Sequence, residues 1–398
     1  MSKTSGNEPL LSTVLLSWNR IHLLQRTVES YLRTVSVPYE LIIVDNGSTD
    51  GAREFIESVC RDRANHRAIM LDNNIGGEAL NAGLTKARGE FLHISANDME
   101  YLPGWDTELL RKFDAFPELG QISPISPFHE IERGEIWVDK PAIRQTVGES
   151  TIYVALANVG DTSILRRQIW NSGVRWQSLL DGSFKFPADG LFSNDVKRLG
   201  YTVAWNDRYL VGNLGHNVSE LKKRLNYYVE SAADKQHLGL EGLITQLHEH
   251  GYRVLFHQNG SAALRRIAEP EETVAYRKRE QWKKWMNWLL LIQKELVILV
   301  PEGACYILVD DSLFGENLLP HRQGRPFLER GGEAWGVPAD SETAIAELER
   351  MRREGASFLI FLWPAFWWLK FYDQFDQYLR AHFRCVLENE LRVVFELG

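Results

Sequence analysis

Asn97 and Asp98 stand in a short polar cluster, residues 96–100, that directly follows the apolar run 90–95. The cluster has two interpretations. Asn and Asp favour turns because their side chains bond to nearby backbone groups, so these residues could simply end a strand. A carboxylate here could instead belong to an oxygen-rich site for a divalent cation. Taken alone the turn is favoured, and the flanking segments must decide.

Four apolar runs in the first 125 residues have the character of buried strands, with amphipathic stretches of helical spacing between them. The runs are 13–17, 40–45, 67–72 and 90–95. Such alternation of strand and helix predicts parallel βαβ units in a twisted sheet. Ligands of these sheets bind outside the carboxyl ends of the strands. The residues that follow each strand are therefore the ones to examine for chemistry.

All four predicted strands end in polar residues. The first ends in 17–20 (SWNR), the second in 45–50 (DNGSTD) and the third in 72–77 (DNNIGG). For any one end, a turn followed by a helix N-cap is the favoured interpretation, with Ser48 or Asp50 as the cap. Four polar ends at one edge of one sheet must converge on a single crevice, which favours a binding site.

Beyond the predicted sheet the chain changes character twice. Residues 126–185 are less regular, with a long loop or hairpin predicted at 126–145 and a strand at 151–157. Helical spacing dominates from residue 219. A second α/β unit follows, whose first strand is predicted at 296–301. We therefore expect three parts, 1–218, 219–296 and 297–398. The last part has no GxGxxG or P-loop, so no nucleotide site is assigned to it.

The composition indicates a globular protein without a nucleic-acid surface. A formal net charge of -8 argues against sequence-independent nucleic-acid binding, which needs a basic surface. No apolar run reaches the roughly 20 residues of a membrane span, and no secretory signal is visible. Cys60, Cys305 and Cys385 lie far apart, as for free thiols in a reducing compartment. We expect a cytoplasmic protein, with peripheral membrane contact left open.

Four segments together resemble a GT-A glycosyltransferase of family 2. They are VLLSWNR, LIIVDNGSTDGAREFI, NNIGGEALNAGLTKARGEFLHISAND and ADGLFSNDVKRLGY. The letters DNGSTDG are the most specific part, and the order and spacing hold over roughly the first 220 residues. The resemblance implies an α/β fold, namely a GT-A nucleotide-diphospho-sugar transferase domain with a Rossmann-like, mostly parallel sheet. A helical linker and a second, smaller α/β domain would follow it.

The resemblance assigns the strand ends to a nucleotide-sugar donor. Within that site, Asp45 would accept a hydrogen bond from the imide N–H of the base, and Arg20 could pair with phosphate. Leu80 stands where the family often has a cation, so one diphosphate partner is missing. The donor-binding residues implied are Ser17, Asn19, Arg20, Asp45, Asn74, Gly76, Asn81, Asn97 and Asp98.

The resemblance also gives the opening cluster a role. The family has a DxD-like acidic motif where this chain has Ala96, Asn97 and Asp98, so Asp98 takes the last carboxylate. Members often complete the site with a His after the last core strand, where His216 stands. A lone His would otherwise be an ordinary surface or core residue. The implied cofactor is a divalent cation, Mn²⁺ or Mg²⁺, on Asp98 and His216, which would neutralise charge on the leaving nucleotide.

Asp189 is the implied catalytic base. In family 2 an acid eleven residues before a helix-ending Gly-Tyr pair takes the proton of the acceptor hydroxyl, and 200 minus 11 gives 189. Ala188 replaces the preceding acid, which leaves Asp195 as a rival. Asp189 is preferred because it begins a helix at the crevice, whereas Asp195 lies among polar and charged neighbours on a solvated face.

The first hypothesis is therefore an inverting, metal-assisted glycosyltransferase. It would move a sugar from a UDP-, GDP- or dTDP-sugar to a hydroxyl of a saccharide, lipid-linked or protein acceptor. The weakened acidic motif keeps a second hypothesis open, a non-catalytic GT-A module that binds carbohydrate or acts as a scaffold. A nucleotidyltransferase is less favoured, since it usually opens with a Gly-rich basic loop. No nucleic-acid partner or transmembrane segment is expected, and the oligomeric state stays open.

Overall fold

The computed structural model describes residues 8–128, 134–135, 142–160, 162–177, 188–233, 239–330 and 333–398. By its internal contacts the chain divides into two compact units, Met1–Trp282 and Lys283–Gly398. Each unit is described by itself. The finer division into 1–218, 219–296 and 297–398 remains a prediction.

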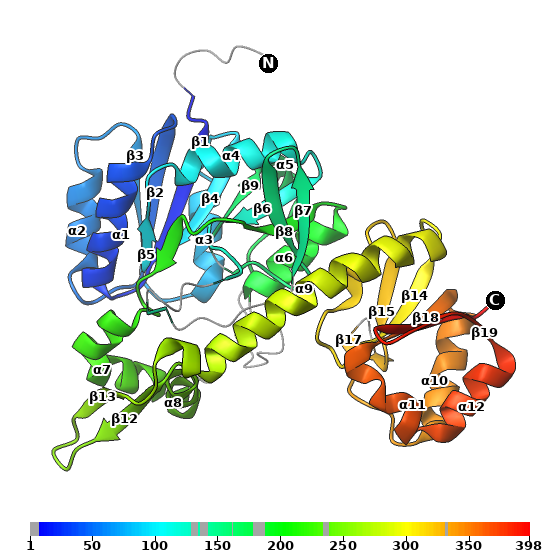
Figure 1. Cartoon of the computed structure of the whole chain (residues 1–398). Coiled ribbons are helices and arrows are strands. Elements are labelled where there is room, and N and C mark those ends of the chain that lie inside the picture. The colour runs from blue at the N-terminus through cyan, green and yellow to red at the C-terminus, as the bar shows by residue number, and fades with distance from the viewer. Residues whose placement is uncertain are drawn as a thin grey trace. The chain divides into compact units, whose positions relative to one another are not determined.

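Unit 1 is built on a mostly parallel sheet, in which the described residues form nine strands (Figure 1). Their order across the sheet is β3-β2-β1-β4-β9-β6-β10-β8-β7. The strands are β1 (Leu11–Ser17), β2 (Tyr39–Asn46), β3 (His66–Leu71), β4 (Phe91–Ala96), β6 (Leu119–Ser123), β7 (Ala142–Val147), β8 (Ser150–Ala155), β9 (Ser163–Arg166) and β10 (Thr202–Asn206).

Most of these strands point the same way. β1 is parallel to both β2 and β4, β2 to β3, and β10 to β6. β9 runs antiparallel between β4 and β6, so β4 and β6 are parallel to each other. The carboxyl ends of β1, β2, β3, β4, β6 and β10 therefore lie at one edge of the sheet.

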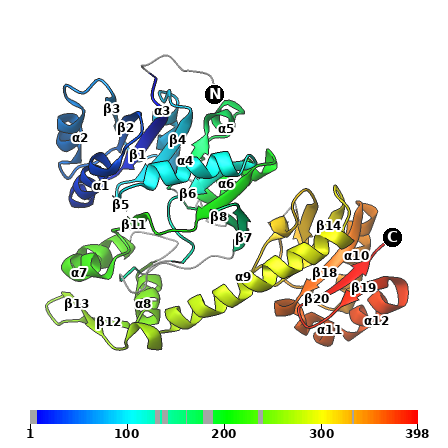
Figure 2. The same cartoon turned by 45° about the horizontal axis from the view of Figure 1, so that its top comes forward.

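Helices join the strands and pack on the sheet. α2 contacts β3 at one side of the sheet, and α6 contacts β10 (Figures 1 and 2). A Cβ on Gly83 would lie 2.4 Å from Val14 Cγ1, so glycine lets α3 approach β1 closely. The helices are α1 (Ile21–Thr34), α2 (Ala52–Cys60), η1 (Gly76–Ala79), α3 (Leu80–Leu84), α4 (Trp105–Ala115), α5 (Arg167–Asn171) and α6 (Ala188–Arg198).

The four strands predicted at 13–17, 40–45, 67–72 and 90–95 coincide with β1 to β4, and the predicted parallel sheet is confirmed. β1 and β2 are buried along almost their whole length. Parallel strands covered on both faces need continuous apolar runs, and this is why the sequence shows no alternation there.

The rest of unit 1 lies beyond the sheet. A two-stranded ribbon pairs β5 (Met99–Tyr101) with β11 (Val211–Asn213). In both views a further group of elements lies together, drawn in green to yellow-green (Figures 1 and 2). The group consists of α7 (Val218–Ala233), α8 (Gly239–Glu249), β12 (Tyr252–Phe256) and β13 (Ala262–Arg266), followed by η3 (Pro270–Glu272). Val218, Leu221 and Leu247 form its small apolar core.

Unit 2 is a smaller α/β domain, as predicted, with a five-stranded sheet of order β15-β14-β18-β20-β19 among the described residues. α9 (Val274–Leu299) begins before the division and ends inside the unit. The other elements are β14 (Cys305–Val309), η4 (Glu316–Leu318), β15 (Gln323–Pro326), β16 (Glu329–Arg330), β17 (Glu333–Ala334), α10 (Ser341–Arg353), β18 (Ala356–Leu362), η5 (Trp363–Ala365), α11 (Trp367–Phe371), α12 (Asp373–His382), β19 (Arg384–Glu388) and β20 (Arg392–Glu396).

The prediction of a strand at 296–301 is wrong, because the helix α9 continues to Leu299. Its apolar residues recur every three or four positions: Leu289, Ile292 and Leu296 are fully buried, whereas Ile298 is 82% exposed. That is the period of a helix. Val300, directly after the helix, is fully buried as well. No helix in the described part of the chain is long and apolar enough to cross a membrane.

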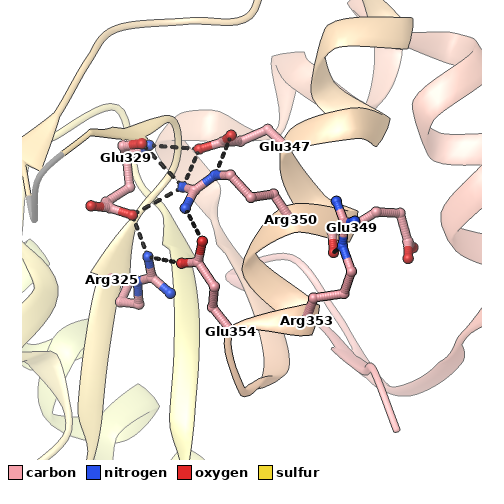
Figure 3. A network of polar contacts seen from close by, with 7 residues as sticks. All are labelled: Arg325, Glu329, Glu347, Glu349, Arg350, Arg353 and Glu354. Carbon is pink, nitrogen blue, oxygen red and sulfur yellow. Dashed lines mark hydrogen bonds and ion pairs between the residues drawn. The ribbon is translucent and has the colours of Figure 1, made fainter.

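An ion-pair network ties α10 to the β15–β16 segment of unit 2 (Figure 3). Buried Glu329 accepts hydrogen bonds from both Arg325 and Arg350, and Arg350 also donates to Glu347 at 2.8 Å and to Glu354 at 2.7 Å. The bonds from Arg350 and Arg325 lower the pKa values of Glu347 and Glu354, respectively. Each of these carboxylates has an arginine partner, so the network is best explained as a structural tie.

A polar and aromatic cluster lies in the core of unit 1, between β1, α1 and β4. His93 Nδ1 lies 3.1 Å from the Thr13 hydroxyl, which in turn lies 2.7 Å from the Tyr31 hydroxyl. His93 and Tyr31 are fully buried, and Trp105 packs on the imidazole with ring centroids 4.7 Å apart. Burial lowers the pKa of His93 to about 3, so the imidazole is neutral in the folded protein at neutral and mildly acidic pH.

Replacing His93 should reduce the amount by which the free energy of unfolding falls on mild acidification. The unfolded chain binds this proton near pH 6.5 and the folded chain only near pH 3. The lowered pKa therefore makes the free energy of unfolding fall as the pH drops below 6.5, by up to about 1.4 kcal/mol per pH unit. The free energy of unfolding, measured with urea at several pH values between about 7 and 5.5, should change less steeply with pH for His93→Gln than for the wild type. His257→Gln, at an exposed position, should keep the wild-type slope. Equal slopes in all three proteins would contradict the buried neutral histidine.

Candidate functional site

The strand register brings the predicted site residues to one row. Ser17 at the end of β1 lies opposite Asp45 on β2, and Leu16 lies opposite Ala96 on β4. Figure 2 shows β2, β1 and β4 as neighbours. The loops that follow these strands therefore meet at the same edge of the sheet, as the sequence predicted.

The loop after β1 makes an unusual backbone turn. Asn19 and Arg20 both have left-handed conformations, with φ of 52° and 57°. The loop after β2 holds this turn: the Asn19 N–H donates to Ser48 Oγ at 2.8 Å, and the Thr49 N–H donates to Asn19 Oδ1 at 2.9 Å. Non-glycine residues adopt this conformation at a free-energy cost, and these bonds offset it.

The turn directs Arg20 toward the end of β4. One guanidinium nitrogen donates to Asp98 Oδ2 at 2.9 Å, and the other donates to Asn97 Oδ1 at 2.6 Å. The Asn97 amide donates in turn to the Asn19 carbonyl at 2.8 Å. Burial alone would lower the pKa of Arg20, but Asp98 and the nearby tyrosines more than offset it, so the pKa lies above its usual value. We call Arg20, Asn97 and Asp98 the guanidinium clamp.

The segment after β11 closes the other side of Asp98. The Leu214 N–H donates to the Asp98 carbonyl at 2.7 Å. A Cβ on Gly215 would lie 2.5 Å from Asp98 Oδ2, so only glycine fits there without a shift. His216 is the next residue, and its N–H donates to Asn213 Oδ1 at 3.0 Å. The structure thus brings the chain at His216 next to Asp98, two residues that the sequence had paired.

Asp45 offers an unsatisfied acceptor. The residue is fully buried, and its Oδ2 accepts from the Ser48 N–H at 3.1 Å and lies 3.6 Å from Arg53. Its Oδ1 is buried with no hydrogen-bond partner among the described residues. A buried carboxylate oxygen left unpaired costs free energy, as expected of an atom that meets a ligand.

Asn74, Gly76 and Asn81, which were also predicted to bind the nucleotide sugar, have hydrogen-bond partners within the protein. Asn46 donates to Asn74 Oδ1 at 2.8 Å and to the Gly76 carbonyl at 3.1 Å. The Asn81 side chain donates to the Trp176 carbonyl at 2.8 Å and accepts from the Trp176 N–H at 3.0 Å. These contacts tie loops together, so Asn74, Gly76 and Asn81 shape the edge of the sheet through their neighbours.

The two acids of α6 differ in their surroundings. α6 leads into β10, which is parallel to β6, so a helix that returns along the sheet has its first turn at the carboxyl edge. Asp189 lies in that first turn and is partly exposed. Asp195 instead accepts a bond from Arg198 at 2.7 Å, and that arginine is 75% exposed. The Asp195 side chain itself is 25% exposed, and its place on a solvated face stays a prediction.

Two tyrosines near the clamp were missed by the sequence analysis. Tyr227 and Tyr228 of α7 both interact electrostatically with Arg20, and burial raises the pKa of each. α7 is joined to α1 by the buried Glu220, which lies 2.9 Å from His22 Nε2. No motif marks these tyrosines, and their only signal is their place in the helix directly after His216.

The donor set fits a divalent cation only in part. Among the described residues there is no group of three or more His, Cys, Asp or Glu that could hold a metal ion. Asp98 and the neighbouring His216 would supply one carboxylate and one imidazole. Mg²⁺ and similar cations are commonly held by one or two carboxylates together with waters and substrate phosphates. The residues therefore fit a cation that shares its shell with a phosphate ligand.

Comparison with known proteins supports the family. Residues 12–169 match the sequence model of the family described as Glycosyl transferase family 2, which confirms the predicted resemblance for this part of the chain. The chain is 30% identical over 108 residues to the succinoglycan biosynthesis protein ExoO of Rhizobium meliloti (strain 1021), covering 27% of this chain and 30% of that protein. It is 29% identical over 106 residues to the putative teichuronic acid biosynthesis glycosyltransferase TuaG of Bacillus subtilis (strain 168), covering 26% and 40%.

These matches are partial. The chain spans less than half the length of both relatives. Among solved structures, the mannosyltransferase PcManGT of Pyrobaculum calidifontis, in complex with GDP-Man and Mn²⁺, is 12% identical with a TM-score of 0.40, covering 73% of this chain and 81% of that one.

Gly215→Ala should destabilise the protein through Asp98. The new methyl would press on Asp98 Oδ2, and overpacking of this kind costs about 1–3 kcal/mol. In an Asp98→Ala background the methyl has more room, so the same substitution should cost less. Urea unfolding of the wild type, both single variants and the double variant would measure the coupling. Purely additive costs would show that Gly215 does not act on Asp98.

Proposed function

We propose that this chain, which carries a glycosyltransferase family 2 domain at residues 12–169, is an inverting glycosyltransferase with a nucleotide-sugar donor. The observation that carries the proposal is the row of polar groups at the ends of β2, β1 and β4. In the described part of the chain, a buried acceptor without a partner, a charged guanidinium and a carboxylate beside the backbone that leads to His216 follow one another there. A nucleoside, a diphosphate and a cation need these groups in this order.

On the donor side, Asp45 Oδ1 accepts from the N–H of the base, since no group among the described residues satisfies it. The base lies at the end of β2 and the cation-binding carboxylate at the end of β4, so the diphosphate between them crosses the end of β1. Arg20 is the charged side chain at that point, and guanidinium groups bind phosphate oxygens in pairs. A divalent cation, Mn²⁺ or Mg²⁺, on Asp98 and His216 would stabilise the charge of the leaving diphosphate.

On the acceptor side, Asp189 is the base. The acceptor oxygen attacks the anomeric carbon from the face opposite the diphosphate, the bond to the diphosphate breaks, and the configuration inverts. Asp189 takes the proton of the attacking hydroxyl. Its place in the first turn of α6, at the carboxyl edge of the sheet, supports this role.

The names of the relatives refer to succinoglycan biosynthesis and teichuronic acid biosynthesis. We take polysaccharide biosynthesis as the setting and a saccharide, free or lipid-linked, as the acceptor. A cytoplasmic place, at or near a membrane, is part of this proposal. A protein acceptor stays an alternative.

A non-catalytic module that binds carbohydrate or acts as a scaffold is the second candidate. The clamp favours it, because Arg20 occupies the one carboxylate that remains of the acidic motif. Release of nucleoside diphosphate from a panel of UDP-, GDP- and dTDP-sugars, with Mn²⁺ or Mg²⁺ and then with EDTA, separates the two functions. Release with one donor supports the transferase. Binding of donors without any release, with or without a saccharide acceptor, would favour the scaffold.

Asp189→Asn should lower kcat by about 10²- to 10⁴-fold with little change in donor KM, because only proton transfer in the transition state is lost. Donor binding, measured by calorimetry, should survive. Asp195→Asn is the matched control on the same helix and should keep near-normal turnover, since that carboxylate pairs with an exposed arginine. A large loss of kcat in Asp195→Asn with near-normal turnover in Asp189→Asn would assign the role of base to Asp195. Full activity in both variants would contradict the proposed mechanism.

A further inference from the structure

The guanidinium clamp occupies two of the oxygens that a cation would bind. Arg20 bonds to Asp98 Oδ2 and Asn97 Oδ1, one carboxylate oxygen and the amide oxygen of the two polar residues in the acidic-motif position. A divalent cation and a guanidinium on the same carboxylate oxygen repel each other, and in a partly buried place that repulsion is poorly screened. The clamp therefore excludes a cation from Asp98 Oδ2 and repels one at Asp98 Oδ1.

The clamp also covers Asp98 from solvent. The side chain of Asp98 is 9% exposed, whereas that of Arg20 is 24% exposed. On the other side, Gly215 lies so close that a methyl group would collide with Asp98 Oδ2. Arg20 is thus the outer member of the pair, and Asp98 becomes accessible when the guanidinium moves.

The backbone limits how the clamp can open. Asn19 and Arg20 are held in left-handed conformations by bonds to Ser48 and Thr49, and the Ile21 N–H donates to Asp50 Oδ2 at 2.8 Å. The start of α1 is therefore fixed on the β2 loop. Because the backbone is held there, Asp98 is released by a rotation of the Arg20 side chain, without a movement of the backbone.

A diphosphate is the ligand that would draw the guanidinium away. The β2-β1-β4 order places Arg20 between buried Asp45 and Asp98, so a diphosphate that joins a base to a cation there must pass Arg20. Its oxygens offer the paired acceptors that a guanidinium prefers. The arginine exchanges one anion for another and stays neutralised throughout.

We propose that Arg20 is the resident counter-ion of Asp98 and keeps the cation site closed until a nucleotide diphosphate takes over the guanidinium, so that cation and nucleotide bind together. This inference rests on the proposed function, because it assigns the order in which that site fills. Arg20 is a positioning residue here: it controls when Asp98 can bind a cation.

Mn²⁺ alone is the probe that tests the closure. The electron paramagnetic resonance signal of free Mn²⁺ is titrated with the full chain, as wild type, as Arg20→Gln and as Arg33→Gln, an arginine of α1 that is 62% exposed. Arg20→Gln should bind Mn²⁺ about tenfold more tightly than the wild type, as expected when a competing ion pair is removed. Arg33→Gln should equal the wild type. Asp98→Asn added to Arg20→Gln should abolish the gain.

The second arm adds UDP or GDP. In the wild type, the nucleotide that binds should tighten Mn²⁺ binding by about tenfold or more, and in Arg20→Gln the increase should be smaller, because the site is already open. Arg20→Lys, which keeps the charge but loses the forked geometry, should fall between the two and serves if Arg20→Gln does not fold. Folding of every variant is checked by thermal unfolding.

The outcomes separate this inference from the proposed function. Equal Mn²⁺ affinity in wild type, Arg20→Gln and Arg20→Lys overturns the closure, whatever the nucleotide does. Failure of every variant to bind Mn²⁺, while nucleotide binds normally in EDTA, also overturns it and would mean that Arg20 replaces the cation altogether. Absence of nucleotide binding under all conditions counts against the proposed function, and the comparison with Mn²⁺ alone still decides the closure.

Discussion

The register between β1 and its two parallel neighbours is the constraint on which the candidate site depends. Backbone bonds set Ser17 opposite Asp45 and Leu16 opposite Ala96. Side chains alternate between the faces of a sheet, so a slip of one residue would exchange what lies on each face and displace the loops that follow. Asp45 Oδ1, which has no hydrogen-bond partner among the described residues, keeps its place because this ladder is fixed. The same holds for the turn at Arg20 and the carboxylate of Asp98.

Much of the fold could be predicted from the sequence, because the first four strands are continuous aliphatic runs that only a covered parallel sheet accommodates. The same reasoning failed at 296–301. A short apolar run is compatible with a buried strand and with the buried face of a helix, and periodicity over six residues does not separate them. The preceding turns of α9, where Leu289 and Ile292 already mark the buried face, carried the deciding signal.

The sequence identified the strand ends of the site but not how they are connected. Arg20 and Asp98 are separated by 78 positions, and their contact requires two successive left-handed residues that no propensity predicts. Asn81 stands in a motif position, yet both ends of its amide are bonded to Trp176, which only the tertiary fold brings near. Tyr228 lies near Arg20 because it belongs to α7, a helix outside the motifs. Residue types were therefore predictable where a strand ended, and pairings were not.

The guanidinium clamp would affect which metal ion binds at Asp98 in a cell. A site of one carboxylate and one imidazole follows the general affinity order of divalent metals, in which Cu²⁺ and Zn²⁺ bind more tightly than Mn²⁺. Protein side chains alone would therefore select the wrong ion. With Arg20 on Asp98, a stray ion finds the carboxylate already neutralised and three-quarters of its covering arginine buried. If the proposed closure holds, protection from mismetallation comes from the protein's own charge, without a metal-binding residue beyond Asp98 and His216.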